Sequence, residues 1–203
     1  GDNSSIDAGL IAWNRFQVML NRHVKANSIF NNGIVSTYSL VYTTSFAYVG
    51  GVLAPNGDIY FVPLRADSGQ KISADGIVST YSLVYADSVG AYSGGVLSPN
   101  GDIHFIPYRA DRGQKIAVDE TVSTYSLVYT ELRAYSGGVL SPNGDIHFVP
   151  TNVDIGQKIA VDGTVSTYSL VYAGSTAYSG GVLAPNGDIH FRSEERRGGK
   201  ERG

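Results

Sequence analysis

The sequence predicts an all-β protein that is built from copies of one four-stranded antiparallel unit. The first observation is a block of the form GGVL(A/S)PNGDI(H/Y)F, which recurs every 43 or 44 residues and begins at Gly50, Gly94, Gly137 and Gly180. The second is the block VSTYSLVY, which lies between these copies and begins at Val35, Val78, Val122 and Val165. A fixed period of this length indicates one structural unit that is stacked on copies of itself.

Each repeat contains four strand-like runs, which we name A to D. In the second copy they are Ser93–Ser98, Asp102–Tyr108, Gln114–Val118 and Thr121–Tyr129. Asn100-Gly101 between runs A and B predicts a tight hairpin, because both central residues of a type I′ turn need positive φ. Apolar and polar residues alternate in runs B and D, as is typical of half-buried strands.

The turn between runs C and D also has hairpin chemistry. It reads Asp75-Gly76 in one copy and Asp162-Gly163 in another, but Asp119-Glu120 in the middle copy. Because glutamate is strained at positive φ where glycine is not, we expect this hairpin to be the weakest of the set.

Four antiparallel strands in 43 or 44 residues, with both faces partly apolar, predict one blade of a β-propeller. The chain supplies a leading D run at Ile34–Tyr42, three complete blades and a final A–B hairpin at Tyr178–Phe191. A closed propeller has about four to eight blades. We therefore expect a propeller fragment with an open arc, whose exposed blade edges can pair with another copy of the chain.

The repeats resemble a known group of proteins. GGVLAPNGDIYFVP, followed by a strand such as VSTYSLVY, resembles the blades of YncE-like, NHL-like and lactonase-type β-propellers. The resemblance covers Ile34–Phe191, and its motif is structural. It implies the propeller fold, which hosts many unrelated functions.

Composition bounds the possible partners. The formal net charge of −3 argues against a nucleic-acid surface, and no run of 18 apolar residues could span a membrane. The chain has no cysteine, which excludes disulfides and thiolate metal sites.

Two terminal segments depart from the repeat. In residues 1–33, Ser4-Ser5-Ile6-Asp7 is a capping-box pattern and favours a short helix from about Ile6 to about Ala26. The alternative for this segment is a degenerate blade. Residues 34–191 form the repeats. Residues 192–203, RSEERRGGKERG, contain eight charged residues and resemble translated sequencing-adapter sequence. We expect this tail to be non-native and the natural chain to continue with further repeats.

Repeated polar residues are the first candidates for chemistry. One position of run B holds histidine in three copies and tyrosine in the other: His104, His147, His190 and Tyr60. We interpret it as packing or hydrogen bonding between blades, because run B does not line the axis and no partner for a metal ion or a base is visible. An aspartate follows each Asn-Gly pair, at Asp58, Asp102, Asp145 and Asp188, and we expect it to stabilise the turn. We predict no metal site, no catalytic residue and no cofactor.

Differences between the repeats are the best indication of function. Tyr92–Tyr129 and Tyr135–Tyr172 differ at six positions, and four of these fall in the predicted B–C loop. The D–A loops vary as well, and both kinds of loop should emerge on the same end of the blades. Either this end is a binding face on a fixed scaffold, or exposed loops simply drift.

We predict a non-catalytic binding or interaction scaffold for a protein or carbohydrate ligand. The candidate contact residues are Tyr108, Arg109, Asp111, Arg112, Arg133 and Asn152. The alternatives are a hydrolase of the lactonase type, whose site would lie at the mouth of the axis, and a purely structural repeat protein. Near-identical blades argue against the enzyme, because one site needs different residues from different blades.

Overall fold

The computed structural model describes residues 38–42, 44–172 and 177–192. The chain divides into two compact units, Gly1–Ser39 and Leu40–Gly203. Of the first unit only Tyr38 and Ser39 are described, so the predicted N-terminal helix and its alternative lie outside the described residues. The tail also lies outside them, except for Arg192.

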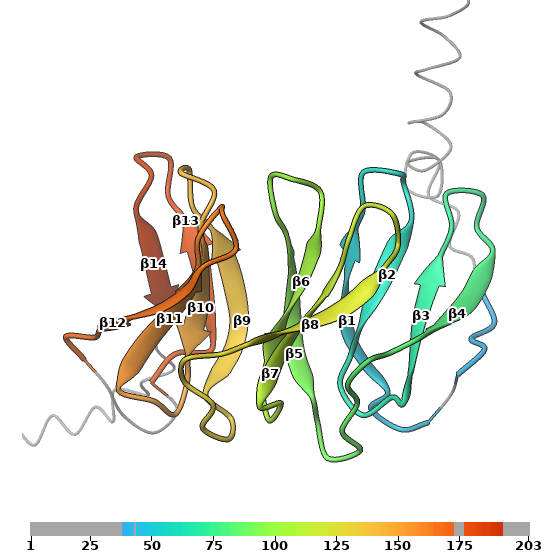
Figure 1. The fold of residues 1–203 in the computed structure, drawn as a ribbon, viewed down its shortest axis with the longest axis horizontal. Coiled ribbons are helices and arrows are strands. Elements are labelled where there is room, and N and C mark those ends of the chain that lie inside the picture. Colours follow the sequence, from blue (N-terminus) through green and yellow to red (C-terminus); the bar gives the residue numbers. More distant parts are fainter. Residues whose placement is uncertain (1–37, 43, 173–176, 193–203) are drawn as a thin grey trace, which may run out of the picture. The chain divides into compact units, whose positions relative to one another are not determined.

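The second unit is all-β, as predicted, and consists of four successive antiparallel sheets (Figure 1). The first blade contains β1 (Tyr48–Leu53), β2 (Ile59–Pro63), β3 (Ser68–Ile72) and β4 (Val78–Ser82). The second contains β5 (Tyr92–Leu97), β6 (Ile103–Pro107), β7 (Arg112–Ile116) and β8 (Val122–Ser126). The third contains β9 (Tyr135–Leu140), β10 (Ile146–Pro150), β11 (Ile155–Ile159) and β12 (Val165–Ser169). A two-stranded hairpin follows, with β13 (Gly180–Leu183) and β14 (Ile189–Arg192). In the described part of the chain, no helix is long and apolar enough to cross a membrane.

The predicted hairpins are present, but the bounds of all four predicted runs differ from the strands, by one residue for runs A and B and by more for runs C and D. Gly101 has a positive φ of 89°, but Asn100 does not have positive φ, so the predicted type I′ turn is wrong. The turn is closed instead by Gly101 N, which donates to Ser98 O at 2.9 Å. Glu120 has the expected positive φ of 68°. Run C begins two residues earlier than predicted, at Arg112. Run D ends at Ser126 instead of Tyr129. Its last residues leave the ladder because their backbone is bonded to the next blade, as described below.

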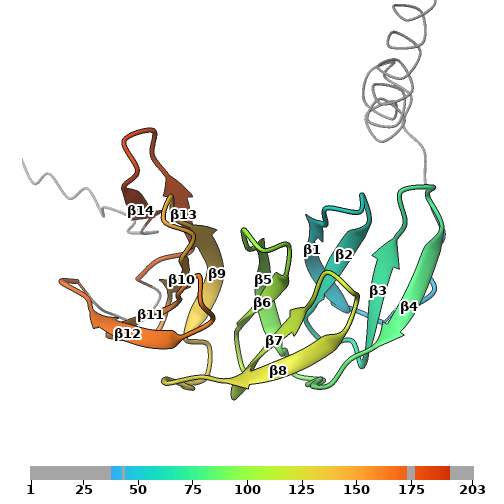
Figure 2. The same ribbon diagram turned by 45° about the horizontal axis from the view of Figure 1, so that its top comes forward.

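The A strands of neighbouring blades lie side by side: β1 contacts β5, β5 contacts β9, and β9 contacts β13 (Figure 2). This close approach depends on the paired glycines of the GGVL block. A Cβ atom on Gly95 would lie 2.6 Å from Val52 Cγ2 of the preceding blade. The glycine pair is therefore a packing requirement that the sequence analysis did not interpret.

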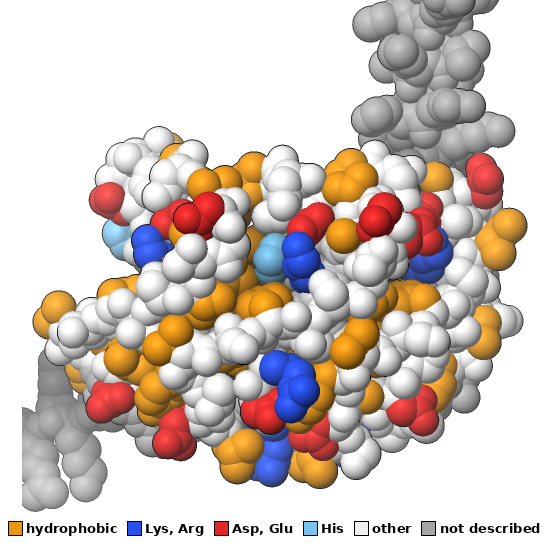
Figure 3. Space-filling view, in the orientation of Figure 1, with side chains coloured by type: hydrophobic (Ala, Val, Ile, Leu, Met, Phe, Trp, Pro, Cys, Tyr) orange, Lys and Arg blue, Asp and Glu red, His pale blue; other side chains and the backbone are white. Residues whose placement is uncertain are grey.

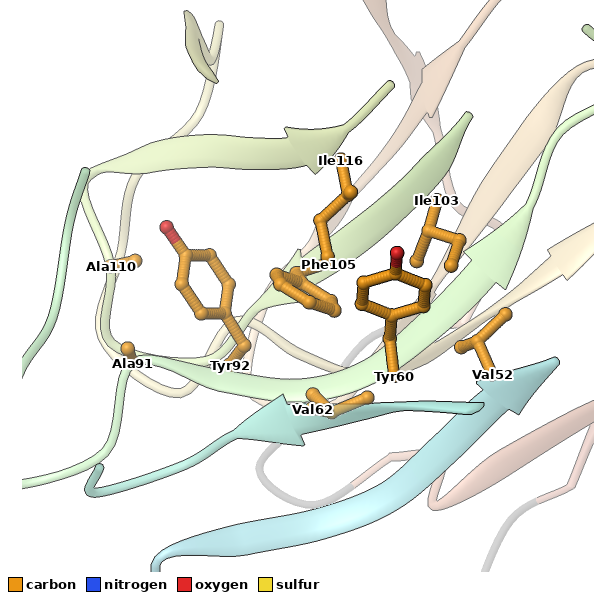
Figure 4. Packing of buried hydrophobic residues seen from close by; sticks show 9 residues of the cluster. All are labelled: Val52, Tyr60, Val62, Ala91, Tyr92, Ile103, Phe105, Ala110 and Ile116. Carbon is orange, nitrogen blue, oxygen red and sulfur yellow. The ribbon is translucent and has the colours of Figure 1, made fainter. Parts of the chain in front are cut away.

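The core lies between blades. Val52, Tyr60 and Val62 of the first blade pack on Phe105 and Ile103 of the second (Figure 4). Val62 and Ile103 are each 1% exposed, and Phe105 is fully buried. Each blade therefore completes its own burial only against the next, as expected for a stacked repeat.

A buried glutamine joins each pair of neighbouring blades. Gln114 Oε1 accepts hydrogen bonds from the backbone N–H groups of Val84 and Tyr85, just beyond the last strand of the preceding blade. Gln157 binds Val128 and Tyr129 in the same way, and all of these bonds are 2.8 to 3.0 Å long. The N–H groups that leave the ladder at the end of run D are thus satisfied.

Candidate functional site

The B–C and D–A loops lie on one end of the blades, which we call the loop face, as the sequence predicts (Figure 1). Neighbouring loops are bonded through their backbones. Ala91 N donates to Leu64 O at 2.6 Å, and Arg133 N donates to Tyr108 O at 2.5 Å. The other end carries the A–B and C–D turns, and we call it the turn face.

Each B–C loop is held by one carbonyl of the D–A loop. The carbonyl of Ala91 accepts from three successive backbone N–H groups, those of Tyr108, Arg109 and Ala110, at 2.9 to 3.2 Å. In the first blade, Ala47 O accepts from Leu64, Arg65 and Ala66 in the same way, at 2.8 to 3.2 Å. The loop backbone is therefore fixed, and the side chains on it differ between copies.

A hollow of about 270 Å³ opens between the loops of the first and second blades. Its walls are formed by Val49, Leu64, Arg65, Val89, Ser93 and Tyr108. Two of the apolar walls remain exposed to solvent, since Val49 is 36% and Val89 is 50% exposed. An apolar hollow with an arginine and a tyrosine at its wall has the composition of a recognition site.

Of the six predicted contact residues, one lines this hollow and three more are linked to it through the loops. Tyr108 lines the hollow, and a Cβ atom on Gly90 would lie 3.8 Å from Arg109 Cδ. Arg133 is bonded to Tyr108 through its backbone, and Asn152 Nδ2 donates to Arg133 O at 3.2 Å.

Asp111 and Arg112 form a separate pair. Arg112 Nε lies 2.7 Å from Asp111 Oδ1, and this hydrogen bond lowers the pKa of the Asp111 carboxyl. The guanidinium also lies over the ring of Tyr85, 5.1 Å from its centroid. Because Arg112 is the first residue of β7, only three of the six differing positions lie in the B–C loop, not four.

One position of the D–A loop has a left-handed backbone in every described copy. Phe46, Gly90 and Arg133 occupy it, with φ values of 57°, 135° and 61°. Non-glycine residues pay about 1–2 kcal/mol for this conformation. Phe46 is nevertheless 68% exposed, and Arg133 is also exposed, so burial of these side chains does not offset the backbone strain.

The sequence analysis missed Arg65 and Phe46. Arg65 aligns with Arg109 in the repeat, and comparing the first copy with the other two would have found it. The guanidinium of Arg65 lies over the Phe46 ring, 5.2 Å from its centroid. No sequence signal identifies the left-handed position of Phe46, because glycine occupies it in only one copy.

This repeat position has a structural role: Tyr60 packs between blades, as predicted, whereas the rings of His104 and His147 pack within their own blade. The ring of His104 packs edge-on against Tyr125 of the same sheet, with centroids 5.6 Å apart. Burial, together with nearby Lys115, lowers the pKa of His104 to about 4. His147 packs on Tyr168 in the same way. No group of three or more His, Asp or Glu side chains in the described ranges could hold a metal ion.

The aspartates after Asn-Gly stabilise the turn face, as predicted. Asp58 Oδ1 accepts from Ala74 N of the C–D turn at 3.1 Å. Three of the four aspartates also pair with a lysine, which the sequence did not predict: Lys71 with Asp58 at 2.9 Å, Lys115 with Asp102 at 2.7 Å, and Lys158 with Asp145 at 2.6 Å.

Comparison with known proteins gives the fold and leaves the activity open. No model of a protein family matches the chain, and no curated protein matches it. Among solved structures, a catalytically inactive variant of virginiamycin B lyase from Staphylococcus aureus, crystallised with quinupristin, matches with a TM-score of 0.69 and 21% identity. That match covers 81% of this chain and 54% of the lyase.

Two further structures agree. A streptogramin B lyase has a TM-score of 0.62 at 22% identity, over 80% of this chain and 59% of that one. A gluconolactonase-like protein has a TM-score of 0.55 at 16% identity, over 75% and 58%. The chain thus spans little more than half the length of these proteins. At such identities the likeness shows the fold alone, which is that of a β-propeller with four-stranded blades.

Proposed function

We propose that this protein is a binding module and that its loop face contacts the ligand. The observation that carries the proposal is the left-handed position of the D–A loop. Glycine would occupy it without strain, yet two of the three described copies place an exposed Phe46 or Arg133 there. Strained residues with exposed side chains cluster at ligand-binding sites.

The rest of the loop face supports the same function. Aromatic and arginine side chains are enriched at the centres of protein interfaces, and aromatic rings also stack on sugars. Tyr108 and Arg65 line the hollow, and Arg109 lies beside it. The fixed loop backbone lowers the entropy that ligand binding would cost. A protein segment or an oligosaccharide is the expected ligand class.

The experiment exploits the repeats. The triple variant Tyr108→Thr, Arg109→Asn and Ala110→Val gives the second B–C loop the sequence that the third already has, so the fold should tolerate it. Wild type and variant are applied to a glycan array and to a random-peptide array. Val118→Ala, on the exposed C–D turn, is the matched control.

We expect at least one glycan or peptide to bind wild type and the Val118→Ala control equally, and to bind the triple variant at least about tenfold more weakly, the equivalent of one good contact. Equal binding by the triple variant, or no binding to either array, would contradict the proposal.

A further inference from the structure

The turn face carries a second feature, which is independent of the loop face. Neighbouring blades form a groove there, and the same repeat positions line each groove. The groove between the first and second blades contains Tyr60, Lys71 and Glu120. The equivalent residues between the second and third blades are His104, Lys115 and Gly163.

In the first groove a carboxylate of the protein itself fills the space beside the lysine. Lys71 Nζ lies 2.8 and 2.9 Å from the two carboxylate oxygens of Glu120, which belongs to the next blade. It also lies 2.9 Å from Asp58 Oδ2. Although burial alone would lower it, these hydrogen bonds raise the pKa of Lys71. The hollow that Tyr60 lines in this groove has a volume of about 30 Å³.

The carboxylate of Glu120 is held at a conformational cost. Glu120 has a φ of 68°, and the equivalent residues in the other two blades are Gly76 and Gly163, with φ values of 84° and 87°. Glutamate is strained in this region and glycine is not. Lys71 therefore binds a second carboxylate beside Asp58, although the residue that supplies it has a strained backbone.

In the second groove that carboxylate is missing. Among the described residues, Lys115 has a single ion-pair partner, Asp102. Its side chain is 34% exposed, whereas that of Lys71 is 17% exposed. A hollow of about 110 Å³ lies beside it, and His104, Lys115 and Gly163 line this hollow together with parts of the two turns. The space is large enough for a carboxylate group and its first methylene groups.

We propose that the groove between the second and third blades binds the carboxylate of an acidic ligand. Lys115 binds this carboxylate as Lys71 binds that of Glu120. The ligand is either the acidic side chain of a peptide or a small carboxylic acid. The acidic residues that face the groove, Asp102 and Asp162, do not prevent this, because Asp58 and Asp119 occupy the same positions where Glu120 binds.

The chain contains five lysines, Lys25, Lys71, Lys115, Lys158 and Lys200, so their side chains can be followed separately by NMR. The full chain is labelled with ¹³C-lysine, and each Cε–Hε signal is assigned with a lysine-to-arginine variant. The probes are propionate and glutamate capped at both ends, with capped glutamine as the uncharged control. Lys158 is left out of the comparison, because the described residues include no C–D turn of a fourth blade beside it.

We expect the Lys115 signal of the wild type to shift saturably with propionate, capped glutamate or both, while Lys71 and the glutamine titration show no such shift. Saturation with capped glutamate alone identifies a peptide side chain as the ligand, and saturation with both probes identifies any carboxylate. Gly163→Glu should weaken the response of Lys115 at least about tenfold, as expected for a charged hydrogen bond already made within the chain. Conversely, Glu120→Gly should make Lys71 respond.

Shifts of Lys115 and Lys71 that rise together without saturation would overturn the proposal, since this is the behaviour of an adventitious ion only. An unchanged Lys115 response in a folded Gly163→Glu variant would also overturn it. If Gly163→Glu does not fold, the response of Lys71 in the Glu120→Gly variant is the deciding measurement. That variant should fold, because glycine relieves the strain at this position.

Discussion

The side-chain oxygen of Gln114 lies 2.8 Å from the backbone nitrogen of Tyr85, which belongs to the preceding blade. The same oxygen accepts from Val84 N at 3.0 Å, and the Gln114 side chain is fully buried. A side chain from the third strand of one blade thus binds the backbone just beyond the fourth strand of the preceding blade. The blades are joined by this polar contact in addition to their apolar core.

Replacement of Gln114 by methionine should destabilise the protein. The two side chains have similar volumes, but methionine leaves two partly buried N–H groups without their acceptor, and a fully buried group would cost about 1–3 kcal/mol. We expect a loss of about 1–3 kcal/mol in the free energy of unfolding, measured by urea denaturation. Ser126→Ala, at an exposed strand end, serves as the control, and an equal effect of both changes would refute the role of the glutamine.

Tyr125 requires a glycine opposite it. The two residues are directly paired between β8 and β7, and a Cβ atom on Gly113 would lie 2.1 Å from the Tyr125 ring. Gly113→Ala must displace this packed ring, and we expect it to cost about 1–3 kcal/mol of stability. Gly180→Ala is the matched control in the hairpin, since its Cβ meets no atom within 4 Å. Thermal unfolding of the two variants should differ clearly.

Acid should weaken the fold through His104. Burial lowers its pKa to about 4, against 6.5 for the free side chain, so the unfolded state binds the proton more readily than the folded state. The resulting stability is present above pH 6.5 and is lost as the pH falls toward 4, by up to about 3 kcal/mol. His104→Tyr, which copies Tyr60, should remove this part of the pH dependence. Parallel pH profiles for both proteins would contradict the assignment.

Arg133 offers a direct test of the loop face. Glycine occupies the equivalent left-handed position at residue 90, so Arg133→Gly should relieve strain and leave the protein as stable as before, or more stable by up to about 1 kcal/mol. Arg133→Ala keeps the strain and should not stabilise. If the loop face binds a ligand through Arg133, both variants lose affinity on the arrays described above. A large loss of stability in Arg133→Gly would show that the side chain is structural instead.

The two ends of the described blades are complementary. Val182 is 63% exposed, while its counterparts Val52, Val96 and Val139 are 8 to 9% exposed. At the other end Ile59 is 38% exposed, although Ile103 and Ile146 are each 1% exposed. These faces are the two halves of the interface that joins successive blades, and two copies of the chain could pair through them, as the sequence predicted for open edges.

Arg192 opposes such pairing. It lies opposite Gly180 in the hairpin, where the second blade places Ile106 opposite Gly94, and Ile106 is fully buried. A charged side chain is costly in that apolar interface, because it loses its hydration there. Arg192→Val should therefore increase self-association, seen in sedimentation velocity as a larger species at lower protein concentration. A concentration dependence identical to that of the wild type would rule out this mode of assembly.

The sequence was sufficient for the fold but only partly for the site. The Asn-Gly turns and the repeated runs predicted each described strand to within about three residues, because short-range turn chemistry and pleat periodicity act locally. The roles of Gln114 and Gly95 were not predictable in this way, since each depends on an atom of a neighbouring blade. Arg65 could have been found by aligning the first copy. The left-handed Phe46 could not, because bulky residues give no sign of such a backbone.

The glutamine contacts all run from one blade to the blade that precedes it in the chain. Each repeat carries the residue that caps the repeat before it, and none that caps itself. Beyond β12 no fourth-blade glutamine lies among the described residues, and Val171 is 109% exposed, whereas its counterparts Val84 and Val128 are 59% and 60% exposed. A repeat added at the C-terminal side would therefore bring with it the glutamine that binds the backbone at the end of run D in the preceding repeat. Such a chain can lengthen by duplication of one unit, with no further change elsewhere in its sequence.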